Sequence, residues 1–217
     1  MTKEMHLIAF HTDSHHALAG RFAASLKDPD ISLEMVHLPT SGSGGGSFRS
    51  ESWRNAVVMK IQKVTEWIKN HPDEILVCSD VDIQFFRPIR PVIEGLFQDR
   101  NLDIAFQAEH SGRSRPYNAG FIAMRCGLRS LALYEAMRDA DISSHVLVDQ
   151  DWINGNIDKF PIRHSHLPHS FWAWSHGSGT LTKDIVLHHA NCTVGKDSLV
   201  EKVVQLDHVR DIVLNGG

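Results

Sequence analysis

The most informative segment of the chain is residues 74–86, which read EILVCSDVDIQFF. Residues 75–78 are continuously apolar, as expected for a strand that helices cover on both faces of a sheet. Two carboxylates, Asp80 and Asp82, follow directly, and the chain is apolar again from Ile83. Burying two like charges beside a core is costly unless a cation or a donor network compensates, and oxygen ligands suit Mg²⁺ or Mn²⁺. The segment therefore predicts a metal site at the end of a buried strand.

The D-x-D spacing alone is weak evidence, because it occurs at three other places in the chain. Residues 28–30 enclose a proline and are typical of a turn, and residues 139–141 are typical of the solvated end of a helix. Residues 149–151 precede an apolar helical pattern. For Asp80 itself, the structural alternative is that its carboxylate caps the turn after the strand.

Strand and helix patterns alternate on both sides of this segment. Strands are predicted at residues 5–10, 33–38, 74–79, 103–107, 120–124 and 185–188, and helices at residues 15–26, 50–70, 128–138, 151–157 and 198–205. This alternation predicts an α/β fold with a mostly parallel central sheet flanked by helices. Ligands of such sheets bind at the carboxyl ends of the strands, so the residues after each strand are the candidates for function.

Composition excludes several classes of protein. The 217 residues carry 22 basic and 26 acidic side chains without a basic run, which argues against a nucleic-acid partner. No apolar run approaches the about 20 residues of a membrane span, and the N-terminus leads into a strand pattern rather than a signal peptide. Three widely spaced cysteines without a C-x-x-C pair favour a reducing compartment. We therefore expect a cytoplasmic protein without a membrane span.

Two local features bear on domain organisation and on metal binding. The glycine-rich residues 41–47 are interpreted as a mobile loop inside one domain, because a boundary there would leave too small a first piece. The expected organisation is thus a single domain over residues 1–217. The 15 histidines are unusually many and suggest metal binding through imidazole.

Four segments in a fixed order carry a family resemblance. They are SDVD at 79–82 with IQFFRP after it, NAGFIAMR at 118–125, DQDWIN at 149–154, and HAN at 189–191 with Gly195-Lys196. The set resembles the retaining, D-x-D metal-dependent nucleotide-diphospho-sugar transferases of the GT-A (Rossmann-like) fold. The resemblance covers residues 5–196, most of the chain.

The resemblance implies that Asp80, Asp82 and His189 bind the Mn²⁺ or Mg²⁺ that bridges the donor diphosphate. His188 and His189 follow each other at a strand end, so their side chains should point in opposite directions. His189 is the better candidate because its spacing to Asn191 and Gly195 fits the family pattern. A hydrogen-bonded histidine at a strand end is the structural alternative.

The resemblance also implies cationic and backbone contacts to the donor. Lys196, with the backbone N–H groups near Gly195, would neutralise the departing β-phosphate. Lys60, on the long helix before the D-x-D segment, matches a basic position that contacts the donor, and Val81 would contribute to donor binding. For both lysines the alternative is a solvated surface charge.

Polar residues at other strand ends match positions that bind the sugar. Gln150 would lie on the reactive face of the transferred sugar, with Asp149 or Asp151 on its hydroxyls, while capping of the next helix explains both aspartates as well. Asn118 could form hydrogen bonds with sugar hydroxyls or form an Asx turn.

Two further segments have open interpretations. His11, Thr12 and Asp13 would contact base and ribose, or Thr12 and Asp13 would form a turn and helix cap. Trp172 and Trp174, in the histidine-rich segment 167–179, could stack on an acceptor sugar or fill the edge of the core.

The predicted function is that of a metal-dependent glycosyltransferase, a hexosyl- or pentosyltransferase. It would use a nucleotide sugar, with UDP expected as the nucleotide, and a carbohydrate or glycoconjugate acceptor of unknown identity. Retention is implied by the resemblance alone, because Asp149 or Asp151 could also act as the base of an inverting enzyme. The alternatives are a non-catalytic nucleotide-sugar-binding domain and a haloacid-dehalogenase-type phosphatase, which also has D-x-D after a strand.

Overall fold

The computed structural model describes residues 4–40, 50–110, 116–140, 149–193 and 198–215. The strands are β1 (Met5–His11), β2 (Ser32–His37), β3 (Ile75–Asp80), β4 (Ile83–Phe85), β5 (Ile104–Ala108), β6 (Tyr117–Arg125), β7 (His164–His166), β8 (Phe171–Ala173) and β9 (Leu187–His189). The helices are α1 (His16–Ser25), α2 (Glu51–Asn70), α3 (Arg90–Leu96), α4 (Leu128–Asp139), α5 (Asp149–Asn156) and α6 (Ser198–Asn215).

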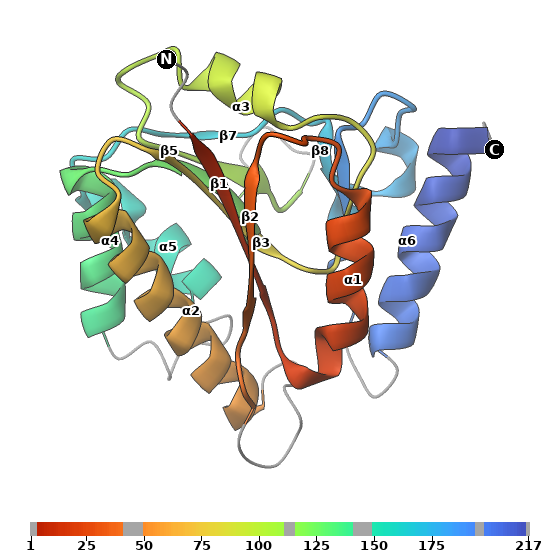
Figure 1. The fold of residues 1–217 in the computed structure, drawn as a ribbon, viewed down its shortest axis with the longest axis horizontal. Coiled ribbons are helices and arrows are strands. Elements are labelled where there is room, and N and C mark those ends of the chain that lie inside the picture. Colours follow the sequence, from red (N-terminus) through yellow and green to blue (C-terminus); the bar gives the residue numbers. More distant parts are fainter. Residues whose placement is uncertain (1–3, 41–49, 111–115, 141–148, 194–197, 216–217) are drawn as a thin grey trace.

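Six strands form the central sheet in the order β2-β1-β3-β6-β5-β7 (Figure 1). Strand β6 is antiparallel to its neighbours β3 and β5, whereas the pairs β1–β2, β1–β3 and β5–β7 are parallel. Five strands therefore share one direction, which confirms the predicted α/β fold with a mostly parallel sheet. The carboxyl ends of β1, β3 and β5 consequently lie at one edge, together with the beginning of β6.

Helices cover both faces of this sheet. Helices α2, α4 and α5 lie on one face (Figure 1). Ile61 and Leu133 of these helices belong to the same buried cluster as Leu76 and Cys78 of β3. The other face is covered by α1, α3 and α6, with Phe22 in the same cluster as Val77. Alternate residues of β3 thus belong to opposite cores, which explains why this strand is apolar almost throughout.

A second, three-stranded sheet in the order β4-β9-β8 continues from the D-x-D segment. Strand β4 begins one residue after Asp82 and pairs antiparallel with β9, so that Ile83 lies opposite His189. The backbone N–H of Ala190 donates to the carbonyl oxygen of Asp82 over 2.9 Å. This small sheet therefore brings a histidine from late in the chain to the end of β3.

The structure differs from the sequence-based expectations in the later elements. Helix α6 continues ten residues beyond Gln205, because Leu206 and Val209 extend its buried side into the core. Helix α3 and the three-residue strands β4, β7 and β8 were not predicted. The strand expected at residues 185–188 is observed as β9 at Leu187–His189. Among the described residues, no helix has both the length and the apolarity needed to cross a membrane. The glycine-rich segment 41–47 lies outside the described residues.

Candidate functional site

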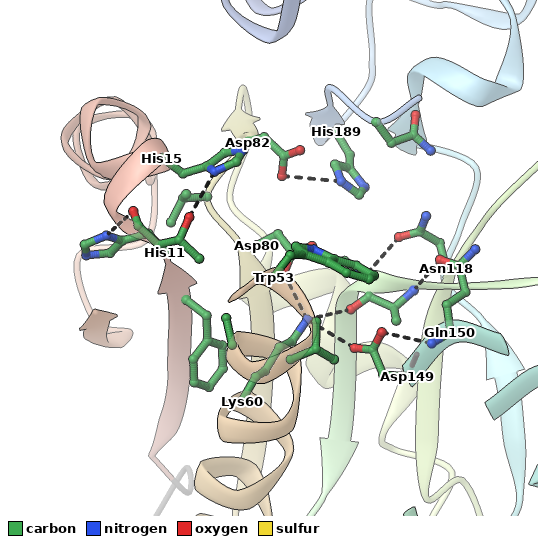
Figure 2. Close-up of a pocket in the computed structure, with 18 of the residues that line it drawn as sticks. His11, His15, Trp53, Lys60, Asp80, Asp82, Asn118, Asp149, Gln150 and His189 are labelled. Atoms are coloured by element: carbon green, nitrogen blue, oxygen red, sulfur yellow. Dashed lines mark hydrogen bonds and ion pairs between the residues drawn. The ribbon is translucent and has the colours of Figure 1, made fainter. Parts of the chain in front are cut away.

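A cavity of about 500 Å³ opens at the edge where β1, β3 and β5 end and β6 begins (Figure 2). This volume is within the roughly 300–1,000 Å³ of small-molecule sites. Its apolar lining comes from the end of β1, the residue after β2 and one face of α2, and includes Phe10, Leu38, Trp53 and Val57. Most of the remaining lining residues are polar, and several of them, such as Asp80, Asp82 and His189, come from the predicted functional segments.

Asp80, Asp82 and His189 converge at this cavity. Each offers one ligand atom, and these atoms lie within 4.8 Å of one another. An Asp82 carboxylate oxygen lies 3.4 Å from Nε2 of His189, and Figure 2 shows the two groups facing each other. Carboxylate oxygens with one imidazole nitrogen suit a divalent ion such as Mn²⁺. The three residues predicted as metal ligands are therefore placed to hold one.

The ring of His189 is oriented by the fully buried Gln107 of β5. The Gln107 Nε2 group donates to the carbonyl oxygen of Phe171 over 3.1 Å, so its Oε1 faces Nδ1 of His189 at 2.7 Å. Nδ1 is therefore the donor of this hydrogen bond, and Nε2 is the nitrogen that faces Asp82. Outer hydrogen bonds of this kind fix ligand histidines in metal sites. Gln107 was not predicted from the sequence, because it belongs to no recognisable motif.

Gly120 of β6 makes room for the same ring. A Cβ at this position would lie 2.3 Å from Cε1 and 3.0 Å from Nε2 of His189. The close approach explains the glycine in the NAG motif better than backbone conformation does, because any side chain would displace the ring.

His188 points away from the site, as strand alternation predicted. It is fully buried beside Trp172, with 5.2 Å between ring centroids. Neither ring nitrogen has a hydrogen-bond partner among the described residues. Burial lowers the pKa of His188 to about 3, so the imidazole is neutral and serves as a core side chain.

Lys60 of α2 is buried and reaches into the site from below Asp80 (Figure 2). Its Nζ donates to Asp80 over 2.9 Å and to the carbonyl oxygen of Ala119 over 3.2 Å, and it lies 3.6 Å from Asp149. Burial alone would lower the pKa of Lys60, but the two carboxylates raise it above its usual value. The lysine is thus an internal cation and not a solvated surface charge.

A second lysine, Lys202 of α6, contacts the other aspartate of the D-x-D segment. Its Nζ donates to Oδ2 of Asp82 and, over 3.0 Å, to the carbonyl oxygen of Ala190. Although burial would raise the pKa of Asp82, Lys202 and then His189 hold it well below the usual range. Sequence reasoning missed Lys202, because an isolated lysine in a helix resembles any surface lysine.

Glu109, one residue after β5, connects the polar residues on the opposite side of the cavity. It accepts hydrogen bonds from Nδ2 of Asn118 and, over 3.3 Å, from Nε2 of Gln150. Gln150 Oε1 in turn accepts from the backbone N–H of Ala119 over 3.2 Å. Asn118 Oδ1 accepts from the N–H of Gly120, as the Asx-turn alternative requires, and Asn118 also lines the cavity. Glu109 was not among the predicted residues, although it also follows a strand.

The aspartates beside Gln150 separate in the structure. Asp149 is buried and lines the cavity, whereas Asp151 is not a lining residue. Burial raises the pKa of Asp149, and Lys60 partly offsets this shift. Of the two, Asp149 is therefore the one placed to meet a bound ligand.

Of the residues predicted at the end of β1, some line the cavity and one supports the neighbouring strand. His11, Thr12 and, at the end of β3, Val81 line the cavity. Asp13 instead accepts hydrogen bonds from Nε2 of His37 over 2.7 Å and from Thr40. The bonds from Thr40 lower the pKa of Asp13 to about 2. Asp13 thus ties the end of β2 to β1.

Two predicted donor contacts, Gly195 and Lys196, lie outside the described residues.

The tryptophan segment is described and forms part of the core. Trp172 is fully buried in β8, and its Nε1 donates to Thr180 over 3.0 Å. Trp174 packs beside His208, with 6.2 Å between ring centroids. The structure therefore favours the core alternative over acceptor stacking for Trp172.

Comparisons with solved structures give the class of fold. One similar structure is a glycosyltransferase involved in the glycosylation of the major capsid of PBCV-1, with a TM-score of 0.65, 13% identity, and coverage of 95% of this chain and 99% of that chain. Another is mouse xyloside xylosyltransferase 1, with a TM-score of 0.54, 13% identity, and coverage of 87% and 98%. No protein-family model and no curated protein sequence matches the chain. The chain therefore has the GT-A fold, with a D-x-D metal-binding triad at the expected edge of its sheet.

Proposed function

We propose that this protein is a metal-dependent glycosyltransferase that moves a sugar from a nucleotide-diphosphate donor, with UDP as the nucleotide, to a carbohydrate or glycoconjugate acceptor. The observation that carries the proposal is the convergence of Asp80, Asp82 and His189 at the ligand-binding edge of a GT-A sheet. Retention of the anomeric configuration is proposed from the sequence resemblance. Hexosyl and pentosyl donors both agree with these residues.

The metal ligands fit a leaving-group role. When bound, a divalent ion supplies Lewis-acid stabilisation of the diphosphate. The two carboxylates would hold the ion from the D-x-D turn, and His189 would offer Nε2, the nitrogen that does not bond to Gln107. Mn²⁺ suits this mixed set better than Mg²⁺, which prefers oxygen ligands alone.

The rest of the cavity supports binding of a nucleotide sugar. Its apolar lining around Trp53 and Val57 suits a base, with His11 and Thr12 beside it for base and ribose. The polar network around Glu109 suits sugar hydroxyls, which accept and donate hydrogen bonds. In this arrangement Gln150 lies on the reactive face of the sugar with Asp149 as its neighbour. Gly195 and Lys196 would meet the departing phosphate.

Incubation with a panel of UDP- and GDP-sugars and Mn²⁺ tests the proposal, with donor hydrolysis and donor binding as readouts. We expect metal-dependent hydrolysis of at least one UDP-sugar and a loss of more than about a hundredfold in Asp80→Ala/Asp82→Ala, which removes the metal ligands. Asp139→Ala, in an exposed carboxylate that pairs only with Arg138 among the described residues, is the matched control. Absence of binding to every nucleotide sugar would refute the function, and full activity of the double variant would refute the site.

The same reaction separates the alternatives. Binding without turnover, even with candidate acceptors, would indicate a non-catalytic nucleotide-sugar-binding protein. Cleavage of simple phosphomonoesters would indicate a phosphatase, although the GT-A fold speaks against it. The configuration of the product at its anomeric carbon decides between retention and inversion.

A further inference from the structure

Each aspartate of the D-x-D segment is already bonded to a lysine. Lys60 binds Asp80, and Lys202 binds Asp82. These two carboxylates and two ammonium groups sum to zero charge, and Asp149, 3.6 Å from Lys60, is a third carboxylate beside them. A site that strongly attracts a free divalent ion would present its carboxylates without such partners.

The two lysines differ in how firmly they hold their aspartates. Lys60 is shared between Asp80 and Asp149, and the Asp80 side chain is 41% exposed. Lys202 has Asp82 as its one carboxylate partner in the described structure, and the Asp82 side chain is 9% exposed. Water therefore screens the Lys202–Asp82 pair less than it screens the Lys60–Asp80 pair. Lys202 is the lysine with the larger effect on an incoming cation.

The two oxygens of Asp82 have different neighbours. Oδ1 lies 3.4 Å from His189 Nε2, on the side of the ligand triad, while Oδ2 is bonded to Lys202. An ion on Oδ1 and the ammonium on Oδ2 would share one carboxylate, so their separation would be well inside a Debye length. The ammonium thus opposes binding of the ion at the same time as it orients the ligand.

We propose that Lys202, assisted by Lys60, keeps the D-x-D carboxylates neutralised before an ion binds, so that the ion binds tightly only together with the diphosphate of the donor. A diphosphate brings several negative charges into the cavity, which Lys202 also lines. It thereby offsets the repulsion between the ammonium and the ion. Lys202 is a positioning residue in this scheme, and the inference rests on the proposed nucleotide-sugar function.

Titration of Mn²⁺ by electron paramagnetic resonance, which counts the free ion, tests the inference without an activity assay. In the wild-type protein we expect UDP to tighten Mn²⁺ binding by about tenfold or more, a usual size for coupling between sites. Lys202→Met should bind Mn²⁺ alone about tenfold or more tightly than the wild type, and UDP should then add less. Lys202→Gln, which keeps a hydrogen-bond donor but loses the charge, should behave similarly.

Two control variants isolate the local charge. Lys202→Arg keeps the charge and should bind Mn²⁺ as the wild type does. Lys63→Met removes a charge from the exposed face of α2, where Lys63 pairs with Glu66, and should change nothing. The inference is overturned if both neutral variants bind Mn²⁺ no more tightly than the wild type.

The wild-type titration needs no variant and gives a second criterion. If the wild-type protein binds Mn²⁺ equally tightly with and without UDP, the inferred coupling between the ion and the diphosphate is refuted, even if neither neutral variant folds. The proposed function fails separately, and the inference with it, if UDP and UDP-sugars do not bind in the presence of Mn²⁺.

Discussion

The orientation of the His189 imidazole depends on two neighbours that do not bind a ligand themselves. Gln107 accepts from Nδ1, and Gly120 leaves the space that the ring occupies. The ring has little freedom to adjust, since His189 is only 4% exposed. Substitutions at these two neighbours should therefore weaken metal binding without removing a ligand.

Gly120→Ala should reduce the affinity for Mn²⁺ in the presence of UDP by about tenfold or more, the size found when support of a metal ligand is lost. The new Cβ would lie 2.3 Å from the His189 ring, so the ring must move. Overpacking of this kind should also lower the free energy of unfolding by about 1–3 kcal/mol. Metal titration and urea unfolding measure the two effects.

Gly20→Ala is the matched control for this change. Gly20 lies in α1, and a Cβ there meets no heavy atom within 4 Å. We expect a gain in stability of about 0.5–1 kcal/mol and unchanged metal affinity. If Gly120→Ala bound Mn²⁺ as tightly as Gly20→Ala, the fixed position of the ring would not matter for the site.

Gln107→Leu should lower the affinity for Mn²⁺ by about 10–100-fold, as is common when the acceptor behind a ligand histidine is lost. Nδ1 of His189 would lose its acceptor, and the ring orientation that directs Nε2 toward Asp82 would lose its support. Gln107→Glu keeps an acceptor oxygen and should recover part of the affinity. Equal losses in both variants, measured by metal titration, would contradict this role.

Some residues of the site could be predicted from the sequence around them, and others could not. Asp80, Asp82 and His189 could be predicted because each lies at the end of a strand pattern and matches a family motif. Gln107 and Lys202 could not be predicted, because their roles arise from contacts with distant parts of the chain. Gln107 contacts His189 across 82 positions of sequence, and Lys202 contacts Asp82 across 120 positions. Nothing in the local sequence distinguishes a supporting glutamine or lysine from an ordinary one.

Among the elements, β9 has two histidines with opposite roles on its two sides. His189 faces the cavity, and His188 faces the small core of Trp172 and Val209. Alternation along the strand predicted this division, whereas neither partner strand, β4 or β8, was predicted from the sequence. Likewise, the direction of β6 is set by its pairing with β3 and not by its own apolar pattern.

The buried His188 makes the stability of the protein depend on pH. Its pKa is about 3 in the folded protein and about 6.5 in an unfolded chain, so the unfolded state takes up the proton first as pH falls. The neutral imidazole costs no stability above pH 6.5, and stability is lost as pH falls from there toward 3. At pH 5 the loss is about 2 kcal/mol, from 1.36 kcal/mol per pH unit.

His188→Phe should remove this part of the pH dependence, because phenylalanine keeps an aromatic ring in the core and takes up no proton. Urea unfolding at pH 7 and pH 5 should show a loss about 2 kcal/mol smaller in the variant than in the wild type. The comparison between proteins cancels the contribution of the other histidines. The same loss in both would mean that His188 takes up its proton in the folded state.

At the scale of the whole molecule, the site joins parts of the chain that the order of elements keeps apart. The parallel strands β1, β3 and β5 bring their carboxyl ends to one edge, which the strand–helix alternation predicted. The small sheet adds β9, and α6 adds Lys202 from near the end of the chain. Helix α6 is also tied to α1 by an ion pair of 2.6 Å between Arg21 and Asp207. Ligand binding at the edge should therefore stabilise the molecule as a whole.

Mn²⁺ and UDP together should raise the midpoint of thermal unfolding by about 5–10 °C. Saturation at 100 times the dissociation constant contributes about 2.7 kcal/mol, and each kcal/mol shifts the midpoint by about 2–4 °C at this chain length. Mn²⁺ alone should give a clearly smaller shift, because Lys60 and Lys202 already pair with the carboxylates that would hold the ion. UDP alone should also give a smaller shift, because its diphosphate would lack the ion. A chelator should reverse the joint shift, and Asp80→Asn/Asp82→Asn should abolish it. Separate shifts that simply add up to the joint shift would show that the two ligands bind independently.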